Sequence, residues 1–146
     1  MASGDLIIFN ESKRQIGAEF DLSNPLDFKV MLIDSIPGVA DIGPGTGNYV
    51  EVAPLGAVYQ AGGLALATTW SEASGIVTHD STINPIWEKD LTGPENIRAA
   101  LLYSISALGP NALGFVDMTQ DGSTPLTLRI GRVAITWNLL GIFSIT

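Results

Sequence analysis

The stretch DFKVMLIDSI, residues 27–36, decides the fold of this chain because it carries its clearest strand signal. Successive side chains of a β-strand point to opposite faces of the sheet. The two faces here carry Phe28, Val30 and Leu32 on one side and Lys29, Met31 and Ile33 on the other. The pair Pro37-Gly38 follows and ends the run. We therefore predict a strand at this stretch.

Outward from this strand, apolar residues recur more often with a period of two than with the helical period of 3.6. Turn residues interrupt them at short intervals, which is typical of a chain of short strands. The predicted strands are 48–52, 64–70, 75–80, 97–106, 113–119, 126–130, 133–137 and 142–146. A turn at 71–75 joins the second and third of these in a hairpin. Another turn, at residues 138–140, pairs the last two.

Two segments have a mixed signal. In residues 97–106, Ala99 and Ala100 favour a helix, but the alternation of apolar and polar side chains from Leu102 to Ser106 favours a strand. We predict the strand. Residues 11–22 have room for one or two helical turns.

These elements predict an all-β fold. With 146 residues, the chain has the length of one domain that can bury a sizeable core. Two half-buried sheets must cover each other, so we predict a single antiparallel β-sandwich, jelly-roll-like, of about eight strands. The predicted division is an N-terminal arm with a short helical turn at residues 1–20 and the sandwich domain at residues 21–146.

Composition limits the partners. The chain has 7 Lys and Arg against 15 Asp and Glu, a net charge of -8, so we expect no direct binding of nucleic acid. The longest uncharged run, residues 52–71, contains Pro54 and three glycines, so we expect no membrane-spanning segment. Only 15% of residues are charged while 46% are hydrophobic. We infer that partner proteins cover part of the surface.

The glycine-rich stretch VADIGPGTGNYV, residues 39–50, resembles the first motif of S-adenosylmethionine methyltransferases. That motif works at a turn from a strand into a helix, followed by an acidic residue about 20 positions later. Here strand formers and Pro54 follow the glycines, and no carboxylate occurs between Glu51 and Glu72. We interpret the stretch as a plain loop, and we expect no cofactor.

Catalytic and metal-binding groupings are poorly supported by the sequence. The single histidine, His79, stands beside Asp80 and Ser81, but adjacent residues of a strand point to opposite faces, so the three cannot form a triad among themselves. We therefore expect a solvated histidine at a strand end and no enzymatic activity. Without cysteine, zinc ligand sets are incomplete. Residues 117–123, DMTQDGS, match the start of a calcium loop but have Leu128 where its bidentate glutamate belongs, so we predict a turn.

Two sequence features are candidates for partner binding. Residues Leu6, Ile7, Ile8 and Phe9 are too apolar to float freely in water, so we expect this segment to order against a neighbouring subunit or a shell. Trp87 lies in a predicted loop near two prolines. An aromatic residue there is either a plug over the end of the sandwich or an interface anchor.

Four stretches, in order, carry a family resemblance. They are DLSNPLDFKVMLIDS at 21–35, YQAGGLALATT at 59–69, the segment 84–118 around Trp87, and VAITWNLLGIFSIT at 133–146. Together they resemble a group of tailed-bacteriophage structural proteins, several of which are head decoration (cement) proteins. The resemblance covers roughly residues 20–146. The N-terminal amphipathic helix usual in that group is degraded here, and the loop 35–48 has its own composition.

The resemblance implies a function and a place. It implies a capsid cement protein that binds the assembled shell, with the major capsid protein or another virion protein as partner, and a tail or tail-fibre component as the alternative. It also implies a homo-oligomer, with a trimer expected at threefold positions of the shell. The expected location is the capsid surface of the virion, after assembly in the cytoplasm of the bacterial host.

Overall fold

The computed structural model describes residues 5–138 and 141–145 of the chain. Residues 1–4 of the predicted arm, residues 139–140 of the predicted turn, and residue 146 lie outside the described residues. The all-β prediction is confirmed. The described elements are β1 (Ile7–Ile8), α1 (Asn10–Gln15), β2 (Phe28–Ile33), the 3₁₀ turn η1 (Thr46–Asn48), β3 (Leu64–Ala65), β4 (Thr68–Ala73), β5 (Ile76–Ser81), β6 (Ile86–Trp87), β7 (Ala99–Ser104), β8 (Ala112–Asp117), β9 (Val133–Ala134) and β10 (Phe143–Ile145).

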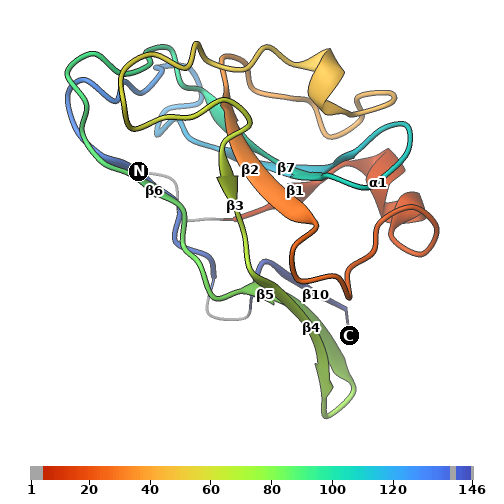
Figure 1. The fold of residues 1–146 in the computed structure, drawn as a ribbon. Coiled ribbons are helices and arrows are strands. Elements are labelled where there is room, and N and C mark those ends of the chain that lie inside the picture. Colours follow the sequence, from red (N-terminus) through yellow and green to blue (C-terminus); the bar gives the residue numbers. More distant parts are fainter. Residues whose placement is uncertain (1–4, 139–140, 146) are drawn as a thin grey trace.

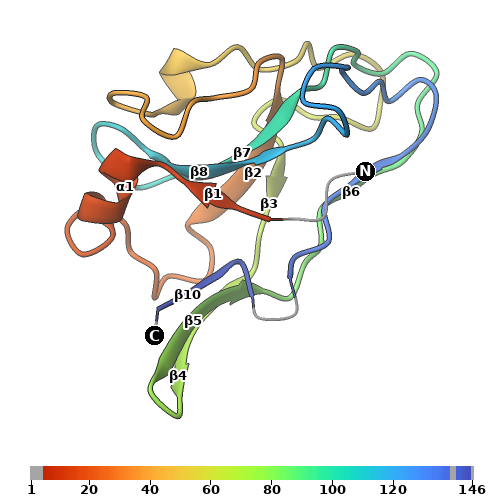
Figure 2. The ribbon, with the colours of Figure 1, turned by 180° about the vertical axis from the view of Figure 1, so that it is seen from behind.

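The strands form three antiparallel sheets (Figure 1). The largest has five strands in the order β1-β8-β7-β2-β3, with β2 and β7 paired over the full length of both. A second sheet has the order β10-β5-β4, and a third joins β6 to β9. Seen from behind, the β4–β5 hairpin projects from the rest of the molecule (Figure 2). No helix of the described residues is long and apolar enough to cross a membrane.

Strand β2 confirms the predicted alternation and shows why it is so apolar. Phe28, Val30 and Leu32 pack into one core cluster, and Met31 and Ile33 pack into a second cluster on the opposite face. The five-stranded sheet is therefore buried on both sides, as a continuous apolar run requires.

Different elements cover the two faces of this sheet. The first face lies under the two small sheets and several loops, whose core residues include Tyr59, Trp87 and Trp137. From the sequence we expect one second sheet in this layer, whereas the structure has two separate small sheets there. The second face packs against Phe9, at the start of α1, and against Tyr49 of the loop 36–49.

Two predicted strands are wrong. Residues 48–52 contribute a single bridge, Glu51 to Ile33, and residues 126–130 a single bridge, Leu126 to Ile97. In the second case the backbone of Leu128 bonds to Pro94 and Asp90, at 3.0 Å each, so a loop takes the place of a partner strand. Both segments thus have the alternating sequence of a strand, but they lack a continuous neighbouring strand to bond with.

The predicted C-terminal strand pair is also wrong. Strand β10 pairs with β5, with Phe143 opposite His79, and β9 pairs with β6. The chain turns at Gly141, whose N–H donates to Asn138 at 2.9 Å and whose φ of 94° favours glycine. A Cβ on Gly141 would also meet the His79 carbonyl at 2.9 Å. This close approach places residues 142–145 along β5 instead of β9.

The predicted hairpin is confirmed, with a shorter turn. Strands β4 and β5 pair without interruption from Thr68–Ser81 to Ala73–Ile76. The turn is therefore Ser74-Gly75 rather than residues 71–75. Both turn residues have positive φ, 53° and 82°, as the favoured two-residue hairpin turn requires. Strands β7 and β8 confirm the strand interpretation of residues 97–106.

Candidate interaction surface

The predicted partner-binding segment Leu6–Phe9 is bound by its own chain. Strand β1 pairs with β8, with Ile8 opposite Gly114, and the Phe9 N–H donates to the Leu113 carbonyl at 3.2 Å. A side chain at Gly114 would meet the Ile7 carbonyl at 2.5 Å, so the glycine permits the pairing. The expectation that a neighbouring subunit or a shell orders this segment is therefore corrected.

The four side chains of the segment Leu6–Phe9 differ in burial. Phe9 is fully buried, with its ring centroid 6.0 Å from Tyr49 and 5.3 Å from Phe115. Leu6 and Ile8 are partly buried against the first core. Ile7 alone of the four is largely exposed, at 41%. Only Ile7 is thus placed to touch a partner.

The helix that follows ties the predicted arm to the sheet. The Ser12 hydroxyl of α1, fully buried, donates to the Ala112 carbonyl of β8 at 2.6 Å. Glu11 accepts the N–H of Gly43 at 2.6 Å, which holds the glycine-rich loop beside the helix. The predicted helical turn is confirmed at Asn10–Gln15. The described part of the arm therefore belongs to the same packed body as the sheet.

Trp87 is a plug, the first of the two alternatives. Its side chain is 1% exposed on β6, and its ring lies 6.0 Å from that of Tyr59. Its indole Nε1 has no hydrogen-bond partner among the described residues. An anchor for a partner has to reach the surface, so Trp87 is not placed to act as one.

The motif YQAGG, residues 59–63, forms part of a hydrogen-bonded cluster beside β2. We call this cluster the polar brace; it contains Glu51, Tyr59, Gly62 and Tyr103. The Tyr59 hydroxyl accepts the Leu32 N–H at 3.0 Å and donates to Glu51 at 2.7 Å. Glu51 also accepts the N–H of Gly62 at 2.6 Å, and the Tyr103 hydroxyl donates to the carbonyl of Gly62 at 2.7 Å. These groups satisfy one another, so the cluster connects segments of the chain.

The electrostatics of this brace also indicate a structural role. Burial, together with the hydrogen bond to the Glu51 carboxylate, raises the pKa of Tyr59 far above its usual value. Burial likewise raises the pKa of Tyr103. Both phenols therefore stay protonated at neutral pH and do not act as bases.

The prediction of a solvated His79 at the end of a strand is wrong. It lies in the middle of β5 and is fully buried, among the rings of Phe28, Trp70 and Phe143 at centroid distances of 5.1, 6.2 and 5.3 Å. Neither ring nitrogen has a hydrogen-bond partner among the described residues. Burial lowers its pKa to about 4, although Asp80 acts in the opposite direction. A buried histidine surrounded by aromatic rings is a core residue, and its alternating neighbours gave no signal of this.

The two motif candidates form turns. The glycine-rich stretch 39–50 is a loop whose one element is the 3₁₀ turn η1, so no α-helix begins at its glycines. In residues 117–123, Asp117 accepts from Thr119, and Asp121 accepts from Ser123 and Thr124. These carboxylates are occupied as turn caps. No group of three potential metal ligands occurs in the described part of the chain.

Three loops that hydrogen bonds join to one another carry several of the most exposed apolar side chains; we call them the loop end and define them as residues 24–27, 41–48 and 105–111. Ala112 donates to Pro44 at 3.1 Å, and Asn111 accepts the Thr46 N–H at 2.9 Å, which joins two of these loops. Buried Asp27 accepts from Ser106 at 2.9 Å, which joins the third.

Four large apolar residues of the loop end are exposed. They are Ile42 at 89%, Leu108 at 82%, Leu26 at 72% and Ile105 at 58%. Single exposed apolar residues are ordinary, whereas a group of them on neighbouring loops is a candidate interaction surface. Other strongly exposed apolar residues lie outside these loops, namely Ile130 at 78%, Leu91 at 73% and Val50 at 65%. The ion pairs within the described residues, Arg14–Glu11 and Arg129–Glu95, lie at the surface, where such pairs contribute little to stability.

Comparisons with protein-family models, with curated proteins and with solved structures found no match.

Proposed function

We propose that the protein is a capsid decoration (cement) protein of a tailed bacteriophage, which binds the assembled shell and stabilises contacts between capsomers. The apolar loop end is the observation that carries this proposal, because its exposed side chains need a protein partner to leave water. The resemblance of four stretches to phage structural proteins supplies the identity of that partner, the major capsid protein.

Docking would bury the loop end against the shell. Full burial of a side chain such as Leu or Ile is worth about 1.5 to 3 kcal/mol, so a few of them are enough for specific binding. With few charges on the surface, salt bridges contribute little to this contact. A trimer around a threefold position of the shell, on the capsid surface, is the arrangement that the resemblance favours.

The experiment that tests this function adds purified protein to expanded capsids that lack it and measures co-sedimentation. We expect binding, and we expect it to survive 1 M salt, where the Debye length falls to about 3 Å and exposed ion pairs weaken. Absence of binding to capsids would contradict the proposal. Release by salt alone would assign docking to charged groups.

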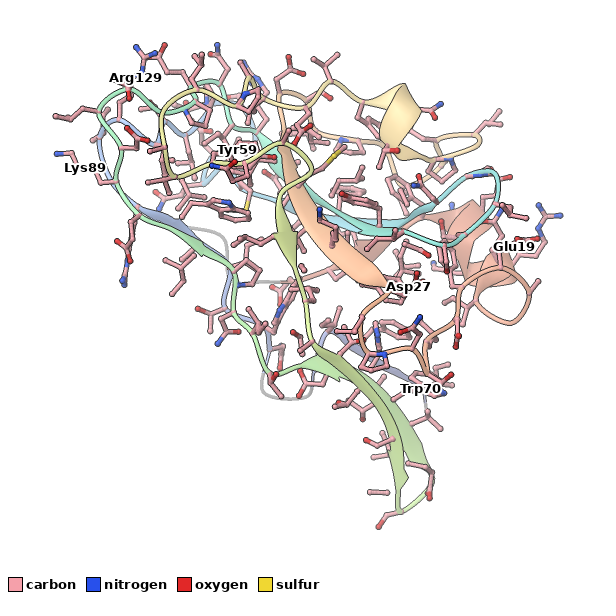
Figure 3. All side chains as sticks on the ribbon, in the orientation of Figure 1. Glu19, Asp27, Tyr59, Trp70, Lys89 and Arg129 are labelled. Atoms are coloured by element: carbon pink, nitrogen blue, oxygen red, sulfur yellow. The ribbon has the colours of Figure 1, made fainter. Side chains whose placement is uncertain are left out.

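A matched pair of variants tests the docking surface. Ile42→Ser together with Leu108→Ser changes two exposed residues of the loop end and should weaken capsid binding at least about tenfold, since lost burial of 1.4 kcal/mol corresponds to that factor. Ile130→Ser changes a residue of similar exposure, 78%, beside Arg129 at another part of the surface (Figure 3). It should bind as the unchanged protein does. Equal binding by all variants would exclude the loop end.

The alternative is a tail or tail-fibre component of the same virion, which uses the fold as an adaptor or a host-binding module. The apolar loop end suits that role equally, because it too requires a protein partner. Localisation in the virion by cryo-electron microscopy or immunogold labelling separates the two functions. Density on the head supports the decoration protein, and density on the tail supports the alternative.

A further inference from the structure

The outer part of the β4–β5 hairpin has little support from its own chain. It projects from the body of the molecule in both views (Figures 1 and 2). Among the described residues, strand β10 pairs with β5 as far as Val77, and the tip of the hairpin extends beyond that pair. In β4 only Thr68 is buried, and Trp70 is half-buried at the root of the hairpin (Figure 3). A two-stranded hairpin is marginal in water, and another strand would stabilise it.

The backbone of β4 has a free edge of defined length. The Thr68 N–H donates to the Pro25 carbonyl at 3.0 Å, on the side away from β5. Alternate residues of a strand direct their N–H and C=O groups to the same edge, so Trp70 and Glu72 also direct theirs away from β5. No hydrogen bond within residues 5–138 and 141–145 uses these groups there. The free edge therefore consists of Trp70 and Glu72.

This edge has little of the usual protection against strand pairing. Natural sheets protect their edges with charged side chains, above all lysine, with proline or with a β-bulge. Strand β4 has the sequence TTWSEA, which contains no lysine and no proline, and its register with β5 is continuous. Its only charge is Glu72.

We propose that the β4 edge pairs with β4 of a second copy of this chain, antiparallel, about a twofold axis at Ser71. Trp70 then lies opposite Glu72 of the second copy, and each such pair exchanges both N–H···O=C bonds. The contact is isologous, so the same groups are used on both copies.

The choice of a second copy follows from the self-matching of this edge. A twofold axis at Glu72 would place like charges opposite each other, which is unfavourable. An axis at Trp70 would need the Thr68 N–H, which Pro25 already occupies. Only the axis at Ser71 uses both free residues of each copy. It also places the Ser74-Gly75 turn of the second copy beside Pro25, where pairing has to end.

This pairing goes beyond shell binding, because it joins two copies along a strand edge that starts beside Pro25 of the loop end but uses none of its exposed apolar side chains. It involves different residues from those proposed to touch the capsid. Loss of the pairing and loss of capsid binding are therefore distinguishable by separate variants.

The absence of cysteine from the chain allows a direct test. Ser71→Cys creates a single cysteine at the proposed axis, where paired residues have Cα atoms about 4.5 Å apart, within the range for a disulfide. Ser144→Cys is the matched control. Ser71 and Ser144 both flank Thr78, one on β4 and the other on β10, and both are exposed.

Under mild oxidation, we expect Ser71→Cys to form the disulfide-linked dimer about tenfold faster than Ser144→Cys, since pairing raises the effective concentration of the thiols. The rates are measured at a protein concentration of about 100 μM, near the weak end of specific affinities. Equal rates for the two variants would overturn the proposal.

A second pair of variants tests the outward backbone N–H of residue 72. Glu72→Pro, in the Ser71→Cys background, deletes the outward N–H while leaving the bonds between β4 and β5. Glu72→Thr keeps this N–H, and both variants lose the carboxylate that accepts from Gly75. The proline variant should crosslink at the rate of Ser144→Cys, and the threonine variant at the rate of Ser71→Cys alone. Circular dichroism verifies the fold, and equal crosslinking by both variants would overturn the pairing.

Discussion

At the scale of single residues, His79 makes the stability of this fold depend on pH. Burial lowers its pKa from 6.5 to about 4, so the unfolded chain takes up a proton at a higher pH than the folded chain. Stability is therefore full above pH 6.5 and falls as the pH drops toward 4. The shift corresponds to a loss of about 3 kcal/mol.

His79→Leu should remove this dependence. Because neither ring nitrogen has a hydrogen-bond partner among the described residues, the variant should lie within about 1.5 kcal/mol of the unchanged protein at pH 7.5. Between pH 6.5 and 5 it should become the more stable of the two. Urea unfolding at several pH values measures both. The same loss of stability in both proteins would place the titrating group elsewhere.

Gly63 and Gly45 give opposite expectations for substitution by alanine. A Cβ at Gly63 would lie 1.8 Å from the Val30 carbonyl, and its φ of +77° is unfavourable for alanine. Gly63→Ala should therefore lower the free energy of unfolding by more than about 3 kcal/mol. At Gly45 the nearest atom is Asn111 Oδ1 at 3.2 Å, so Gly45→Ala should cost less than about 1 kcal/mol.

Thermal or urea unfolding of both glycine variants checks this prediction. The same measurement tests the plain-loop interpretation of residues 39–50. S-adenosylmethionine should not raise the melting temperature of the unchanged protein, because no α-helix follows the glycines. Similar losses for the two variants would mean that the close approach at Gly63 does not limit stability.

At the scale of elements, β10 holds the three-stranded sheet to the core. Ile142 is 5% exposed, and the Phe143 ring lies against His79 at 5.3 Å. Deletion of residues 142–146 should therefore destabilise the protein by about 3 to 5 kcal/mol. Deletion of residues 144–146 should cost far less, because Ile145 is 47% exposed. Urea unfolding distinguishes them, and equal losses would show that pairing along β5, rather than apolar burial, is decisive.

The N-terminal segment, residues 1–9, also contributes to the core. Deletion of residues 1–9 removes the buried ring of Phe9, and loss of such a ring costs about 3 to 5 kcal/mol. The truncated protein should therefore be unstable whatever it binds. Ile7→Ser changes the exposed residue of β1 and should leave the melting temperature within a few degrees. Weaker capsid binding by this variant would add Ile7 to the docking surface, and unchanged binding would remove it.

At the scale of the whole molecule, charge keeps copies apart while apolar contacts bring them together. The net charge of -8 is spread over a surface that also exposes the apolar loop end. Salt screens the repulsion but hardly weakens apolar burial. Self-association, measured by light scattering at pH 7.5, should therefore increase between 0.05 and 1 M salt (roughly 14 to 3 Å in Debye length). A decrease would show that ion pairs between copies dominate.

The sequence by itself determined the all-β class, the strand β2 with its two apolar faces, the β4–β5 hairpin and the loop character of residues 39–50. These features depend on neighbouring residues: alternation assigns side chains to faces, and glycine or proline interrupts the chain locally. Tertiary structure alone decided which backbone each strand meets. It paired β10 with β5, left residues 48–52 and 126–130 with single bridges, and buried Phe9, His79 and Trp87. Pairing and burial depend on segments far apart in the chain, because a strand is completed only by a neighbour and a side chain is buried only by what packs over it.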